Sequence, residues 1–214
     1  MCIKICIVDD HEIFRRGLSQ IVDAEPDMKV VAQAVDYASF FRILETGKVT
    51  PDVVVLDVSL PGGKNGQMIL SKIMEQTRPP KVMVLTMYAD PHFGLTLLRQ
   101  GAAGYLTKES DPGLVVESIR RVAGGKRVMP DAVTELMLGG NRKTESPLHH
   151  ALSGREFQVF MCLSNGQTVG DTAISIGVNI KTVSTYRSRI LTKLQLTNNM
   201  EIIRYGLNHN LASR

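Results

Sequence analysis

Apolar residues in the first 123 positions gather in short runs that alternate with longer amphipathic segments. The runs are Ile3–Val8, Met28–Ala34, Val53–Leu56, Val82–Leu85 and Gly104–Leu106. Short runs rich in Val and Ile are typical of strands, and the segments between them show the three-to-four-residue spacing of helices. The alternation predicts a doubly wound α/β domain, in which a five-stranded parallel sheet carries helices on both faces.

The pattern changes after Ala123. The next stretch is rich in Gly, Pro and polar residues, which predicts a linker with one short helix over Ala132–Leu138. From Leu148 onward the spacing is helical, and three breaks separate four expected helices. We therefore expect an α/β domain, a linker and a small all-α domain over 1–123, 124–147 and 148–214, respectively.

Composition is compatible with this two-domain arrangement. The chain has 214 residues, of which 43% are hydrophobic and 21% charged, so it can bury a core and is unlike a disordered protein. Residues 148–214 carry seven Lys and Arg against three Asp and Glu, so a polyanion-binding surface is expected there.

The cysteines and the apolar runs indicate a cellular location. The three cysteines have neither metal-ligand spacing nor the even count of a disulfide framework, which favours the reducing cytoplasm. No apolar run approaches the roughly 18 residues that a membrane span needs, so no membrane association is expected.

Polar side chains follow several of the predicted strands directly. In a doubly wound sheet, ligands bind beyond the carboxyl ends of the strands, so these side chains should converge at one edge. They are Asp9, Asp10, Asp57, Thr86 and Lys108.

Three carboxylates that lie close together repel one another unless a cation neutralises them, and Mg²⁺ prefers oxygen ligands. These strand ends carry no Ser or Cys with a His partner, so a carboxylate is the remaining nucleophile. Attack by a carboxylate on phosphorus would give an aspartyl phosphate, with Mg²⁺, Lys108 and Thr86 supplying charge neutralisation and alignment.

Four motifs carry a family resemblance. They are Val8-Asp9-Asp10-His11 followed by Arg15 and Gly17, Asp57 with Pro61, Leu85-Thr86, and Gly104-Tyr105-Leu106-Thr107-Lys108. In this order and at these separations they resemble the response regulators of two-component signalling, in the NarL/FixJ group with a LuxR-type DNA-binding domain. The resemblance implies a flavodoxin-like receiver with strand order 2-1-3-4-5, and a transcription regulator rather than an enzyme.

The resemblance also implies roles for individual residues. Asp57 would accept a phosphoryl group from a sensor histidine kinase. Asp9 and Asp10 would hold Mg²⁺, with Asp57 and the backbone carbonyl of Ser59 completing the site. Lys108 would pair with a phosphoryl oxygen. Thr86 would move toward the phosphate, and Tyr105 would rotate into the vacated space as the switch.

The basic end of the chain predicts a helix-turn-helix. Thr168–Ile176, a turn at Gly177-Val178 and Asn179–Leu194 have the required lengths, and the second helix puts small polar residues and arginines opposite its apolar stripe. A solvated face would look the same, but Thr182–Tyr186 resembles the LuxR-type recognition helix. The expected contacts to double-stranded DNA are Lys181, Ser184, Thr185, Arg187, Ser188, Arg189 and Lys193. The last helix would pair two copies in a homodimer when the protein is phosphorylated or bound to DNA.

Some features depart from the family pattern. The loop between Pro61 and Gly66 is one residue longer than usual, and Thr172 stands where the family has an isoleucine, which should loosen packing. His11 is expected to be exposed, and the pair His149-His150 is expected to lie on the linker surface.

Two alternatives are open. The chain could bind DNA regardless of phosphate, with the pocket as a relic, and unchanged DNA affinity after beryllofluoride treatment would favour that hypothesis. It could also be a hydrolase resembling the haloacid dehalogenases, with Asp57 as nucleophile. Those enzymes carry a second Asp two residues later, and Ser59 occupies that position here.

Overall fold

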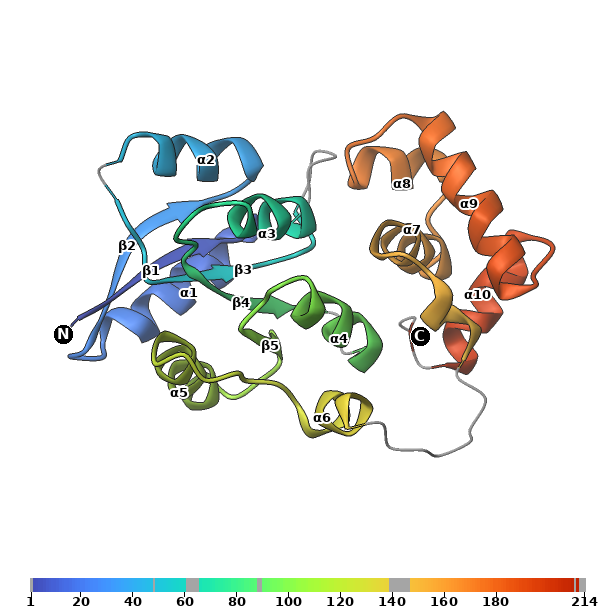
Figure 1. Cartoon of the computed structure of the whole chain (residues 1–214). Helices are drawn as coiled ribbons and strands as arrows, with labels where there is room; N and C mark the ends of the chain where they lie inside the picture. The colour runs from blue at the N-terminus through green and yellow to red at the C-terminus, as the bar shows by residue number, and fades with distance from the viewer. Residues whose placement is uncertain are drawn as a thin grey trace. The chain divides into compact units, whose positions relative to one another are not determined.

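The computed structural model describes residues 2–47, 49–60, 66–87, 90–138, 147–209 and 211. The chain forms two compact units. The first contains a sheet with its helices, and the second contains helices alone (Figure 1). None of the helices in the described ranges is long and apolar enough to span a bilayer.

The sheet of the first unit is parallel throughout, and its strand order is β2-β1-β3-β4-β5. This confirms the predicted fold class and strand order. The strands are β1 (Ile3–Val8), β2 (Met28–Ala34), β3 (Val53–Leu56), β4 (Lys81–Thr86) and β5 (Gly104–Thr107). All four residues of β3 are buried, as expected for a central strand that is covered on both faces.

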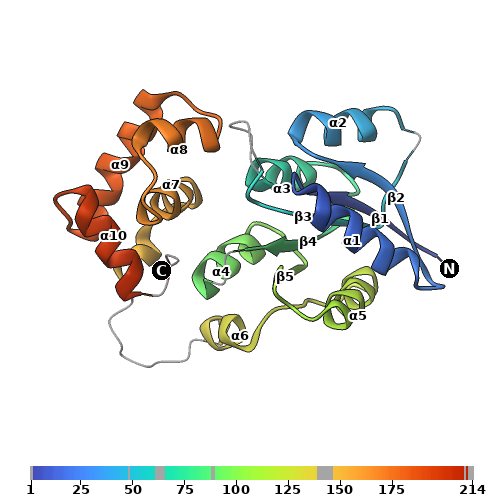
Figure 2. The ribbon, with the colours of Figure 1, turned by 180° about the vertical axis from the view of Figure 1, so that it is seen from behind.

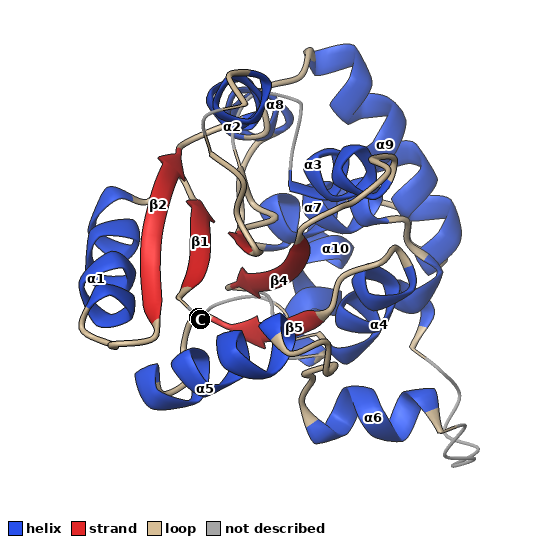
Figure 3. Cartoon of the chain, turned by 60° about the vertical axis from the view of Figure 1, so that its left-hand side comes forward, coloured by secondary structure: helices blue, strands red, loops and turns tan. Residues whose placement is uncertain are grey.

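Helices cover both faces of this sheet. They are α1 (Glu12–Asp23), α2 (Tyr37–Glu45), α3 (Gly66–Met74), α4 (Pro91–Arg99) and α5 (Pro112–Ala123), while α6 (Asp131–Met137) packs against α4. Figure 3 shows α1 and α5 on one side of the sheet and α2, α3 and α4 on the other. Val22 of α1 and Ile119 of α5 belong to the same buried cluster as Ile5, Val55 and Met83 of the strands. Burial of these apolar side chains is the main force that holds the layers together.

Residues 124–138 pack into the first unit, although their sequence pattern predicts a linker. Val128 is buried and forms a bridge to Gly104, and its carbonyl accepts a 2.9 Å hydrogen bond from the N–H of Tyr105. The helix α6 contacts α4 through a face that includes the fully buried Val133. Only a few isolated apolar residues, such as Val128 and Val133, hold this segment in place. Because they do not recur at a regular spacing, the sequence pattern indicated a linker. The rest of the expected linker, residues 139–146, lies outside the described residues, as does the loop 61–65.

The register of the sheet brings the polar strand ends together. Val8 of β1 pairs with Leu56 of β3, so Asp9 and Asp57 each follow a paired residue. The N–H of Asp57 also donates to the carbonyl of Val8 at 2.8 Å. At the other side of β4, the N–H of Lys108 donates to the carbonyl of Thr86 at 2.8 Å. Parallel strands thus deliver these residues to one edge of the sheet.

The second unit is built from η1 (Leu148–Ala151), α7 (Gly154–Ser164), α8 (Val169–Ser175), α9 (Ile180–Leu194) and α10 (Asn199–Asn208). The helix α7 contacts α8, α9 and α10 (Figure 2). Ser153 and Thr168 begin α7 and α8 with reciprocal capping boxes, and Asn179 caps α9. The turn between α8 and α9 contains Gly177 at φ +64°, a left-handed conformation that favours glycine.

The expectation that His149 lies on the surface is wrong. Its side chain is 6% exposed, and its Nδ1 lies 3.1 Å from the hydroxyl of Tyr205 in α10. Its ring also contacts those of Tyr205 and His209 edge-on. The polar composition around His149 suggested a solvated segment, but a hydrogen bond to Tyr205 and these ring contacts compensate for its burial.

Candidate functional site

The strand ends of the first unit form a cluster of acidic groups. Asp9, Asp10, His11 and Asp57 each offer one ligand atom, and these atoms lie within 4.8 Å of one another. The side chains of Asp9 and Asp57 are 3% and 0% exposed. Oδ1 of Asp10 is also buried from solvent, yet it accepts no hydrogen bond. Three adjacent carboxylates with an unsatisfied oxygen are a donor set that fits a hard divalent cation such as Mg²⁺.

Lys108 supplies a positive charge to this cluster. Its Nζ lies 2.6 Å from Oδ2 of Asp57 and 2.7 Å from Oδ2 of Asp9. The ring of Phe14 covers the amine from one side, with its centroid 4.7 Å away. One ammonium group cannot neutralise three carboxylates, so the pocket retains excess negative charge.

The pKa values reflect this crowding. Burial raises the pKa of Asp57 above its ordinary value, and the charge of Asp9 adds to the effect, while Lys108 and the N–H of Ser59 oppose it. Burial acts to lower the pKa of Lys108, but the two carboxylates outweigh it and the pKa is raised. The pocket therefore stabilises Lys108 as a cation and leaves Asp57 in need of further positive charge.

The residues after Asp57 are held close to it. The N–H of Ser59 donates to Oδ1 of Asp57 at 2.9 Å, and Oγ of Ser59 is buried without a hydrogen bond. The first residue of α3, Gly66, lies so close to β3 that an added Cβ would stand 2.2 Å from the carbonyl oxygen of Asp57. A glycine is therefore needed where α3 approaches the acidic pocket.

Thr86 and Tyr105 lie on the neighbouring strands. Thr86 is fully buried at the end of β4. Tyr105 of β5 is 1% exposed, and its hydroxyl donates to the carbonyl of Asp90 at 3.3 Å. The ring of Tyr105 lies against Gly94 of α4, where an added Cβ would be 2.6 Å from the ring. Tyr105 is thus held in an inward position beneath α4.

Sequence reasoning missed one member of the cluster. His11 was expected to be exposed, and its side chain is 57% exposed, but its Nδ1 lies 3.2 Å from Oδ1 of both Asp9 and Asp10. The loop is further held by Arg15, whose NH1 donates to the carbonyl of Asp9 at 2.7 Å. The position of His11 directly after two acidic strand-end residues was the available signal.

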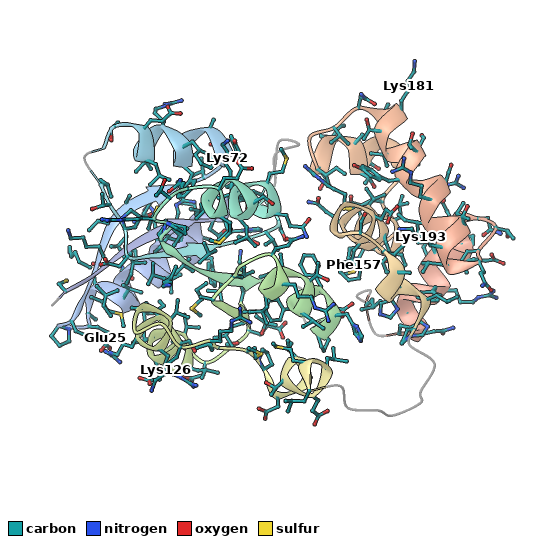
Figure 4. All side chains as sticks on the ribbon, in the orientation of Figure 1. Glu25, Lys72, Lys126, Phe157, Lys181 and Lys193 are labelled. Carbon is teal, nitrogen blue, oxygen red and sulfur yellow. The ribbon has the colours of Figure 1, made fainter. Side chains whose placement is uncertain are left out.

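The predicted recognition helix corresponds to α9. Its apolar residues Val183, Ile190 and Leu194 are buried in the second unit. Six of the seven polar residues expected to contact DNA are exposed along α9, namely Lys181, Ser184, Thr185, Ser188, Arg189 and Lys193. Figure 4 shows Lys181 extending away from the unit. This arrangement leaves a polar and basic face free for a ligand.

Arg187 and Lys193 of α9 have partners within the unit. Nε of Arg187 donates to Oδ1 of Asn199 at 2.5 Å. Nζ of Lys193 donates to Oε2 of Glu156 at 2.6 Å and to the carbonyl of Ala151 at 3.0 Å. Lys193 therefore bridges α9 to α7 and η1, a role that helical spacing alone does not indicate.

Two family models match the chain. The model described as response regulator receiver domain matches residues 5–120. The model described as bacterial regulatory proteins, luxR family, matches residues 150–206. The acidic pocket lies in the first match and α9 lies in the second.

Individual proteins are similar over the whole chain. The oxygen regulatory protein NreC of Staphylococcus haemolyticus is 33% identical, and the alignment covers 97% of this chain and 98% of that protein. A structure of RcsB from Salmonella enterica serovar Typhimurium, bound to the promoter rprA in the presence of beryllofluoride, has 21% identity and a TM-score of 0.69. It covers 96% of this chain and 98% of the other, and shows that the two share a fold. The response regulator ChrA has 26% identity and a TM-score of 0.51, with 98% of each chain covered. The chain therefore belongs to the two-component response regulators that control transcription through a LuxR-type DNA-binding domain.

Proposed function

We propose that Asp57 is the phosphoacceptor of this regulator and takes its phosphoryl group from a sensor histidine kinase. The observation that carries this proposal is the fully buried Asp57 carboxylate, held between Lys108 and the acidic residues Asp9 and Asp10. Oδ of Asp57 attacks phosphorus, so one P–O bond forms while the P–N bond to the kinase histidine breaks. The electron pair of that P–N bond remains on the departing imidazole.

Asp9, Asp10, Asp57 and the backbone carbonyl of Ser59 would hold the Mg²⁺ that this transfer needs. When bound, Mg²⁺ neutralises charge on the carboxylates and on the phosphoryl oxygens. Lys108 reaches the carboxylate of Asp57 and can therefore pair with an oxygen of the phosphoryl group attached to it.

Thr86 and Tyr105 form the proposed switch. The hydroxyl of Thr86 moves toward the new phosphoryl group and leaves space at the end of β4. Tyr105 lies on the adjacent strand, paired with Val84 of β4, and its ring, already buried beneath α4, turns into that space when it opens. A local change in charge thereby biases the position of α4, which packs against Tyr105.

The exposed face of α9 is the proposed DNA-binding surface. Ser184, Thr185 and Ser188 are short enough to let the helix approach the major groove, and Lys181 and Arg189 reach phosphates. Arg187 and Lys193, which the sequence placed among the contacts, have partners in α10 and α7 and would position α9. The proposed roles place the protein in the cytoplasm with its kinase and its DNA.

A homodimer is the proposed DNA-bound form. Met200 and Leu207 of α10 are 72% and 42% exposed, which provides apolar surface for a second copy. RcsB, which shares this fold, has been solved as dimers on DNA. A dimer would read half-sites about one helical turn apart.

Mass spectrometry tests the phosphoacceptor directly. After incubation with acetyl phosphate and Mg²⁺, the wild type should carry one acid-labile phosphoryl group on Asp57, and Asp57→Asn should carry none. Asp52→Asn is the matched control, because Asp52 is an exposed carboxylate just before the opposite end of β3. An adduct that persists in Asp57→Asn would reject the assignment.

Binding to a pool of genomic DNA fragments tests the switch. Beryllofluoride should raise the affinity of the wild type and leave that of Asp57→Ala unchanged. Equal affinity of the wild type with and without beryllofluoride would instead identify a regulator that binds DNA regardless of phosphate.

A further inference from the structure

His11 brings a nitrogen atom to a cluster whose other candidate ligands are the carboxylate oxygens of Asp9, Asp10 and Asp57. Its Nδ1 lies 3.2 Å from Oδ1 of Asp9, 3.2 Å from Oδ1 of Asp10 and 3.8 Å from Oδ2 of Asp57. Adjacent donors on one octahedral ion, each at about 2.1 Å from it, are about 3 Å apart. The nitrogen thus stands at donor spacing from two carboxylates at once, and it also lies 3.4 Å from Nζ of Lys108.

The backbone holds His11 in this place. Its N–H donates to Oδ1 of Asp9 at 2.8 Å, and it occupies the position just before α1 with φ −77° and ψ 100°. Arg15, one turn into α1, binds the carbonyl of Asp9 at 2.7 Å. The imidazole, 57% exposed, covers the outer side of a cluster whose inner carboxylates are nearly inaccessible to solvent. It is therefore placed where an ion entering from solvent would meet it.

We propose that Nδ1 of His11 is a ligand of the divalent cation in this pocket and shifts its selectivity from Mg²⁺ toward transition ions such as Mn²⁺ and Ni²⁺. The inference rests on the proposed function of the pocket and adds the identity of the ion. Mg²⁺ binds almost entirely through oxygen, whereas imidazole suits transition ions, whose affinities rise from Mn²⁺ to Ni²⁺ at a given site. A nitrogen ligand beside three carboxylates should therefore raise the affinity of the site most for Ni²⁺ and least for Mg²⁺.

Pulsed electron paramagnetic resonance on Mn²⁺ bound to the full-length, untagged protein tests the ligand. The wild type should show modulation from a coupled ¹⁴N nucleus, and protein labelled with ¹⁵N only in histidine should show ¹⁵N coupling in its place. The labelling needs no substitution, so folding is not in question. Mn²⁺ bound to the protein without any histidine nitrogen coupling would overturn the proposal.

Calorimetry on the same untagged chain tests selectivity. His11→Gln keeps a neutral oxygen donor and removes the ring nitrogen, so Ni²⁺ affinity should fall by more than about tenfold. Losing a residue that only hydrogen-bonds a metal ligand already lowers metal affinity by about tenfold or more, and loss of the ligand itself should cost more. Mg²⁺ affinity should stay close to that of the wild type. His92→Gln, in α4 and outside the cluster, is the matched control and should leave both affinities unchanged. Equal Ni²⁺ affinity of His11→Gln and the wild type would contradict the proposal.

The phosphorylation assay separates this inference from the proposed function. An acid-labile group on Asp57 in Mg²⁺, together with Mn²⁺ that shows no nitrogen coupling, would reject the role of His11 and retain the phosphoacceptor. Nitrogen coupling without any adduct on Asp57 would support the role of His11 and reject the phosphoacceptor.

Discussion

Nζ of Lys108 lies 2.6 Å from Oδ2 of Asp57, although the two residues are 51 positions apart in the chain. The same amine reaches Asp9 at 2.7 Å, so a single side chain joins the ends of β1, β3 and β5. Its side chain is 4% exposed, and those of its two partners are 3% exposed or less. Because water hardly reaches these three side chains, each charged group relies on the others for compensation. Removal of any one of them should therefore be destabilising.

Lys108→Met should destabilise the first unit by about 3 kcal/mol, because it leaves two buried carboxylates without their cation. Urea unfolding measures the change. Mg²⁺ should restore more stability to the variant than it adds to the wild type. The double variant Lys108→Met with Asp57→Asn should recover much of the loss. Equal stabilities of the single and double variants would argue against charge repulsion as the cause.

Gly94→Ala should expel the ring of Tyr105 from beneath α4 without phosphorylation, because its Cβ would lie 2.6 Å from that ring. Chemical modification of tyrosine, detected by mass spectrometry, measures the solvent accessibility of Tyr105. Gly17→Ala is the matched control, since a Cβ at Gly17 in α1 meets nothing within 4 Å. That variant should leave Tyr105 protected and stabilise α1 by up to about 1 kcal/mol. A protected Tyr105 in Gly94→Ala would show that α4 shifts instead.

Glu156 should make the second unit sensitive to acid. Burial acts to raise the pKa of its carboxyl group, but hydrogen bonds from Lys193 and Ser153 outweigh this effect and lower the pKa below 4.5. A lowered pKa in the folded state stabilises the fold above the pKa of the unfolded chain, and this stability is lost as pH falls through the folded value. At pH 7, Glu156→Gln should lower the free energy of unfolding of the second unit by about 2 kcal/mol. At a pH below the folded-state pKa of Glu156, the substitution should change it very little.

Hydrogen exchange on peptides from α7 and α9 measures this effect in the second unit. In the wild type, protection should decline as the pH falls below 4.5, the ordinary pKa of a glutamate. The decline should be weaker in Glu156→Gln. Parallel pH profiles for the two proteins would rule out Glu156 as the titrating group.

Thr172→Val should stabilise the second unit by about 1 kcal/mol, because Thr172 is fully buried and its Oγ1 has no hydrogen-bond partner. Valine has nearly the same shape without the buried hydroxyl. The melting temperature of the full chain is the readout. Thr192→Val on α9 is a control of opposite sign, since the exposed hydroxyl of Thr192 already donates to the carbonyl of Ser188. A lower melting temperature for Thr172→Val would show that its hydroxyl has a partner in solution.

Lys181 and Lys193 should separate DNA binding from domain stability. Lys181→Ala should flatten the slope of log affinity against log salt by about 0.9, the effect of losing one phosphate contact, and leave stability unchanged. Lys193→Ala should instead lower the stability of the second unit, because its amine bridges Glu156 and the carbonyl of Ala151. Fluorescence anisotropy with labelled DNA at several salt concentrations, together with thermal melting, measures both. An unchanged slope in Lys181→Ala would place that side chain away from DNA.

Much of the architecture is readable in the chain, because strands and helices leave periodic patterns that depend on near neighbours. The strand containing Val53–Leu56 was identified from four consecutive apolar residues, and the fold class and strand order were confirmed. Asp9, Asp57 and Lys108 could be assigned to one edge because each follows a strand, and parallel strands end on the same side.

Other features depend on which residues meet across the fold, and no local pattern carries that information. The pairing of Lys193 with Glu156 joins positions 37 apart, and that of His149 with Tyr205 joins positions 56 apart. The packing of Val128 into the first unit likewise required the three-dimensional structure. A polar side chain looks the same in sequence whether it meets solvent or a buried partner. Only the packed fold determines whether water or a buried partner supplies the hydrogen bonds and the opposite charge that this side chain needs.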